Sequence, residues 1–185
     1  MTDLGNKRKG FTELLKRLMP MIFAAAGFIT GVLAGAFSGS HGALPTPDMS
    51  SAFKSPSPFY SVMTCVSSEI KYEVLVYLLG FCSFGNAACL LTAAYRAALA
   101  GWSAVYLLER GYPRGLYFIH SATSLMMLTL LCCLAMLSIG YSERFVRGCE
   151  RVGREEVLSY TVKCLFFVGL TIGVVIIRQL LLLIK

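Results

Sequence analysis

Long apolar runs separated by short polar segments dominate the pattern along the chain. Several runs reach the roughly 20 residues that a helix needs to cross a hydrocarbon core of about 30 Å. Their apolar positions are continuous, whereas the strands of a membrane barrel alternate between apolar and polar residues. The pattern therefore predicts an all-α fold, a polytopic integral membrane helical bundle that forms a single membrane domain over residues 1–185.

About five transmembrane helices are predicted, and the second and third are the least clear. Arg96 divides residues 74–95 from a short apolar run at 97–108, so residues 74–108 could instead form one interrupted helix or a re-entrant hairpin. A polar N-terminal segment precedes the first apolar run. This segment and the run are each longer than the corresponding regions of a signal peptide, which favours an uncleaved membrane anchor. The five predicted spans are 18–38, 74–95, 97–108, 116–139 and 164–184.

Basic residues gather in two of the segments between the spans, and this bias predicts the orientation. Cytoplasmic loops carry an excess of Lys and Arg. Five crossings place the basic segments 1–17 and 140–163 on one side, which predicts a cytoplasmic N-terminus, a cytoplasmic 140–163 loop and an extracytoplasmic C-terminus. The Ser- and Pro-rich segment 39–73 then forms the long extracytoplasmic loop, whose second half, 59–73, could form a short interfacial helix that leads into the second span. The net charge of +7 is explained by this topology and by contact with anionic lipid, so it requires no nucleic acid partner.

Glycine recurs at every fourth position of the first apolar run. Residues four apart lie on nearly the same face of a helix, and small residues let two membrane helices approach closely. We therefore predict a helix-packing face formed by Gly27, Gly31, Gly35 and Gly39. The pattern leaves open whether the partner helix belongs to the same chain or to another copy in a homo-oligomer.

Catalytic and metal-binding motifs are sparse. The sequence has no phosphate-binding P-loop and no His/Asp/Glu cluster with metal-ligand spacing, and no acidic residue falls inside a predicted span. We therefore predict no catalytic residues, no metal site and no cofactor, and a protein that is not an enzyme. The seven cysteines contain no C-x-x-C pair, and Cys65 is the one predicted to lie on the extracytoplasmic side of the membrane.

A few polar residues do fall in or near the predicted spans. Arg96 is predicted at the turn between the second and third spans, where it can reach lipid head groups. Arg178 is predicted to snorkel outward, because no span offers an acidic partner. His120 is predicted to be a hydrogen-bonded packing residue. Candidates for a polar pathway between helices are Ser83, Asn86, Ser103, Thr123 and Ser124.

The stretch LLGFCSFGNAACLLTAAYRAALAGWSAVYLLERG at 78–111 resembles the central signature of the stage II sporulation protein M family. The residues that carry the resemblance are Gly80, Gly85, Arg96 and Gly101. The five-span layout and the long first outer loop are also similar to that family. Two features depart from it: Ala97 stands where the family often has Gly, and the last span lacks the acidic residue common near its end.

The resemblance implies a non-catalytic role. Members of that family are multi-pass proteins of endospore-forming bacteria, found in the mother-cell membrane at the sporulation septum. They act in engulfment as a scaffold or anchor for extracytoplasmic peptidoglycan-degrading sporulation proteins, which carry the catalysis. The family has also been likened to permease domains, so the alternative expectation is a membrane subunit of an ABC-type or other small-molecule transporter.

Overall fold

The computed structural model describes residues 2–39, 58–109, 111, 113–147 and 153–183. In this part of the chain the secondary structure is entirely helical, which confirms the predicted all-α fold. The five helices are α1 (Thr2–Gly39), α3 (Pro58–Leu79), α4 (Gly85–Glu109), α5 (Arg114–Arg147) and α6 (Arg154–Leu183).

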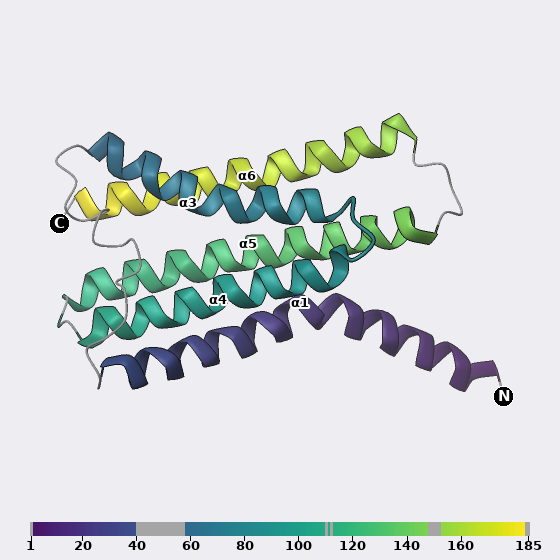
Figure 1. Ribbon diagram of the computed structural model, residues 1–185, viewed down its shortest axis with the longest axis horizontal. Helices are drawn as coiled ribbons and strands as arrows, with labels where there is room; N and C mark the ends of the chain where they lie inside the picture. Colours follow the sequence, from purple (N-terminus) through teal and green to yellow (C-terminus); the bar gives the residue numbers. More distant parts are fainter. Residues whose placement is uncertain (1, 40–57, 110, 112, 148–152, 184–185) are drawn as a thin grey trace.

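The helices lie along one long axis and alternate in direction (Figure 1). The beginning of α1, the connection between α3 and α4, the end of α5 and the beginning of α6 lie at one end of the bundle. The end of α1, the beginning of α3, the end of α4, the beginning of α5 and the end of α6 lie at the other. The chain therefore traverses the bundle five times, and its two basic segments share one end. Which end faces the cytoplasm stays a prediction from charge.

Four of the described helices are long and apolar enough to cross a membrane, so the chain is a membrane-embedded helical protein. These candidate spans are Leu18–Phe37, Gly85–Glu109, Arg114–Arg144 and Arg154–Leu182. The helix α3 has 22 residues but is not among them. It carries Glu69, Lys71 and Glu73 within one and a half turns.

The helix α3 packs against three other helices. It contacts α4, α5 and α6, while α1 packs along α4 and touches α5. Figure 1 shows α1 at one edge of the bundle and α6 with α3 at the other. One face of α3, which carries Glu69 and Glu73, is therefore turned toward other helices, whereas Lys71 is exposed.

The predicted boundary at Arg96 is wrong. The chain breaks at residues 80–84, and α4 runs without interruption through Arg96. At the break, the Gly80 nitrogen donates to the Val76 carbonyl at 3.2 Å and the Gly85 nitrogen donates to the Cys82 carbonyl at 3.0 Å. Two glycines that bracket a short turn end a helix more readily than one Arg within an Ala-rich run, since Arg and Ala both favour helix.

Other helix boundaries also extend beyond the predicted spans. Residues 58–73, predicted as part of the outer loop, belong to α3. The helices α5 and α6 leave only residues 148–153 between them, fewer than the predicted loop 140–163. The helix α1 begins well before the first predicted span and contains Pro20, and Figure 1 shows a bend near the middle of this helix. A proline lacks the N–H of a helical hydrogen bond and crowds the preceding turn, which accounts for the bend.

Candidate functional site

The glycine face of α1 lies against α4 of the same chain. A Cβ atom added at Gly27 would overlap the backbone carbonyl of Ala94, and one added at Gly31 would overlap that of Ala98. An added Cβ at Gly35 would lie 3.0 Å from the Cβ of Val105. The two backbones are therefore in contact where the side chains are smallest, which is the geometry of small-residue packing in membranes.

The contact is reciprocal, because α4 also presents a glycine to α1. A Cβ added at Gly101 would overlap the Phe28 carbonyl and would lie 3.0 Å from the Val32 nitrogen. Gly101 belongs to the signature that carries the family resemblance, so the glycine face and the signature meet at one interface. Gly39 is the last residue of α1, and its surroundings lie outside the part of the chain that the structure describes.

The other two signature glycines lie at the turn between α3 and α4. A Cβ at Gly80 would overlap the hydroxyl of Tyr160, and one at Gly85 would overlap the carbonyl of Leu79. The turn is also held from α5, where the hydroxyl of Ser142 donates to the Cys82 carbonyl at 2.7 Å. These glycines therefore allow the turn to pack tightly against α5 and α6.

The fourth signature residue, Arg96, forms an ion pair in the interior of the bundle. Its Nε donates to Glu69 Oε2 at 2.9 Å, and its Nη2 lies 2.5 Å from Glu69 Oε1. The side chains are 11% and 14% exposed, and the guanidinium also lies 5.9 Å from the ring centroid of Tyr72. The predicted position at a membrane-surface turn is wrong: Arg96 is in the middle of α4 and pairs with α3.

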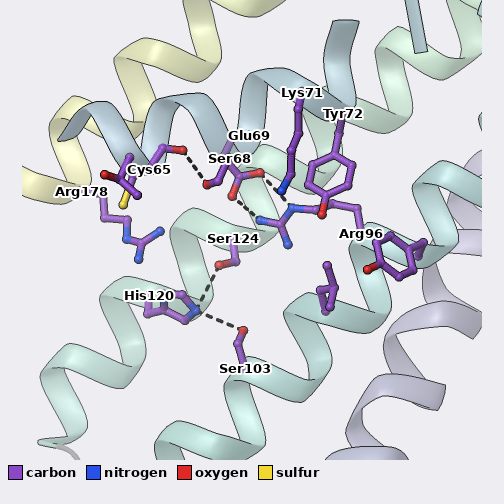
Figure 2. A pocket seen from close by; sticks show the side chains of 13 residues that line it. Cys65, Ser68, Glu69, Lys71, Tyr72, Arg96, Ser103, His120, Ser124 and Arg178 are labelled. Carbon is purple, nitrogen blue, oxygen red and sulfur yellow. Dashed lines mark hydrogen bonds and ion pairs between the residues drawn. The ribbon is translucent and has the colours of Figure 1, made fainter. Parts of the chain in front are cut away.

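This pair bounds a polar cavity of about 310 Å³ between α3, α4, α5 and α6 (Figure 2). Figure 2 shows Arg96 and Glu69 facing each other, with Arg178 extending from α6 and His120 from α5. The polar and charged residues that line the cavity are Thr64, Ser68, Glu69, Lys71, Tyr72, Tyr95, Arg96, Ser103, His120, Ser124 and Arg178.

Arg178 is buried, so the prediction that it snorkels outward is wrong. Its side chain is 6% exposed and lines the cavity. The prediction failed because residues 58–73 of α3 were assigned to the outer segment, which left no acidic residue in any span. With α3 in the bundle, Glu69 and Glu73 lie among the membrane helices and Arg178 turns toward the interior.

His120 is a hydrogen-bonded interior residue, as its sequence position predicted. Its Nε2 lies 3.2 Å from the Ser103 hydroxyl and 3.5 Å from the Ser124 hydroxyl. Both serines were pathway candidates, and both line the cavity. Thr123 instead donates to the backbone carbonyl of Ile119 at 2.8 Å. Ser83 and Asn86 are not among the residues around the cavity.

A second buried carboxylate lies one turn further along α3. Glu73 is 3% exposed, and its Oε1 accepts a hydrogen bond from the Thr171 hydroxyl of α6. Among the described residues its Oε2 has no hydrogen-bond partner. The two carboxylates of α3 thus bind polar side chains of other helices, Arg96 of α4 and Thr171 of α6. The spacing of residues in the sequence does not predict these pairs.

Cys65 is also in the interior of the bundle, which corrects its predicted place in the extracytoplasmic loop. It is 8% exposed, and Gln179 Nε2 donates to its sulfur at 3.4 Å. Within the described ranges no three His, Cys, Asp or Glu side chains gather as metal ligands would. The arrangement that does stand out is a cavity with more cationic than anionic side chains.

Comparisons with protein-family models, with curated proteins and with solved structures found no match for this chain.

Proposed function

We propose that this protein is a non-catalytic membrane scaffold, or anchor, of a sporulation complex that remodels septal peptidoglycan during engulfment. It would reside in the mother-cell membrane at the septum and hold extracytoplasmic peptidoglycan-degrading proteins there. This proposal starts from the resemblance of residues 78–111 to the stage II sporulation protein M family.

The observation that supports it is the use of the signature residues in assembling the bundle. Gly80 and Gly85 form the tight turn between α3 and α4, and Gly101 receives the backbone of α1. Arg96 joins α4 to α3 through Glu69. A signature whose members hold helices together fits a rigid platform better than it fits a set of groups aimed at a reacting substrate.

Deletion of the gene in its endospore-forming host tests the proposal. We expect sporulating cells to divide asymmetrically and then to stop before engulfment is complete, as followed by membrane staining. Affinity purification of the tagged protein should recover a peptidoglycan hydrolase. Normal engulfment by the deletion strain, with no hydrolase recovered, would contradict the scaffold proposal.

A second candidate is a subunit of a small-molecule transporter, and the polar cavity favours it. A water-sized path through lipid needs polar groups inside the bundle, and Arg96, His120 and Arg178 supply them. This candidate predicts co-purification with an ATPase rather than with a hydrolase. The identity of the recovered partner therefore separates the two candidates in one experiment.

A further inference from the structure

We propose that the polar cavity is a binding site for a phosphate group, carried either by a phospholipid or by a free anion, with Arg178 as its main contact. The inference is independent of whether the protein serves as a scaffold or as a transporter subunit.

The first reason is the buried and unmatched guanidinium of Arg178. The side chain is 6% exposed, and no hydrogen bond or ion pair joins it to any other described residue. Its Nε is enclosed and has no partner in that part of the chain. A buried charge is costly unless it is paired, and a guanidinium binds phosphate or carboxylate oxygens through its fork of N–H donors.

The second reason is the balance of charge around the cavity. Three lining residues, Lys71, Arg96 and Arg178, carry a positive charge, and Glu69 carries the negative charge among the lining residues. Because Glu69 pairs with Arg96, the lining keeps an excess of two positive charges; Lys71 is exposed, so the buried part of this excess lies on Arg178. A phosphate group carries one or two negative charges and several acceptor oxygens, so it matches this excess better than a neutral ligand does.

The third reason is the size and depth of the cavity. A volume of about 310 Å³ is within the usual range for small-ligand sites and leaves ample room for a phosphate. Arg178 is five residues from the end of α6, or about 8 Å along the helix axis. His120 is six residues from the beginning of α5, about 9 Å from the same end of the bundle. Arg178 and His120 are therefore much nearer to this end of the bundle than to the other, which is the end from which a lipid head group or a dissolved anion would enter.

The test uses the purified full chain, stripped of lipid in a non-ionic detergent. One arm titrates inorganic phosphate against sodium chloride at matched ionic strength. The other titrates short-chain phosphatidylglycerol against a diacylglycerol of the same chain length, which lacks the phosphate. We expect the thermal unfolding midpoint to rise saturably in at least one phosphate arm, and the arm that responds identifies the source of the group.

Variants then assign the response to the cavity. Arg178→Gln should raise the apparent Kd about tenfold or more, because it removes a charge-assisted contact with the phosphate. Arg154→Gln is the matched control, because Arg154 is an exposed arginine on the same helix and does not line the cavity. Its Kd should equal that of the wild-type protein.

Lys71→Gln keeps the test decisive if Arg178→Gln does not fold. Lys71 is exposed yet lines the cavity, so its replacement should preserve the fold and weaken binding by roughly two- to fivefold. The proposal is overturned if neither phosphate arm shifts the midpoint of the wild-type protein. It is also overturned if a folded Arg178→Gln variant binds as tightly as wild type, or if Lys71→Gln does so when Arg178→Gln cannot be measured.

Discussion

The ion pair between Arg96 and Glu69 determines how α3 and α4 fit together. Both residues lie in mid-helix, and the two hydrogen bonds between them give the pair a fixed geometry. Bringing two charges out of water is expensive, but removing one partner leaves the other charge buried and unpaired, which costs more. The pair therefore acts less as a source of stability than as a constraint on the alignment of the two helices.

Glu69→Gln should lower the free energy of unfolding by about 3 kcal/mol, because Arg96 would be left without its carboxylate. Glu109→Gln is the control, since Glu109 is exposed at the end of α4 and its loss should matter by less than about 0.5 kcal/mol. Denaturant unfolding in detergent micelles measures both. The double variant Glu69→Leu with Arg96→Leu should lose less than the two single changes combined, and strict additivity would argue against the pairing.

At the scale of the helices, α1 is attached to the bundle mainly through α4. The backbone of α1 contacts the backbone of α4 at Gly27 and Gly31, and Gly101 of α4 contacts the backbone of α1. Such a contact depends on the absence of side chains, because dispersion between closely approaching helices replaces the hydrophobic effect inside lipid. A single larger residue therefore separates the two helices along several turns.

Gly31→Leu should detach or displace α1, because even a Cβ atom at this position overlaps the Ala98 carbonyl. We expect a loss of about 2 kcal/mol or more in unfolding free energy. Gly169→Leu in α6 is the matched control, since nothing lies within 4 Å of a Cβ added there. An equal effect of the two substitutions would show that glycine itself, and not the packing face, governs stability.

For the whole molecule, alternating helix direction separates two chemically different ends. The N-terminal part of α1, the end of α5 and the beginning of α6 share one end, and the residues that line the polar cavity lie nearer to the other. If the basic end is cytoplasmic, the cavity faces the extracytoplasmic side. The orientation thus decides which anions and which partner proteins the site can meet.

Cysteine labelling in intact cells tests this orientation. Because native Cys65 is buried, new cysteines are needed in a background without the native ones. Glu109→Cys and Gly153→Cys place exposed thiols at opposite ends of the bundle. A membrane-impermeant maleimide should label the first in intact cells and the second only after permeabilisation, and the reverse result would invert the topology.

The sequence by itself determined the helical membrane class, the apolar spans that lie within α5 and α6, and the small-residue face of α1. Each of these depends on a local property, either a continuous apolar run or a residue spacing within one helix. The interior position of α3 and the buried state of Arg178 were decided only by the tertiary structure. Glu69, Lys71 and Glu73 make this part of α3 look like a segment outside the membrane, because three charges are costly in lipid. In the fold, Arg96 of α4 pairs with Glu69, and Thr171 of α6 donates a hydrogen bond to Glu73. The sequence of α3 alone does not predict these contacts with other helices, so the position of α3 in the bundle follows only from the tertiary structure.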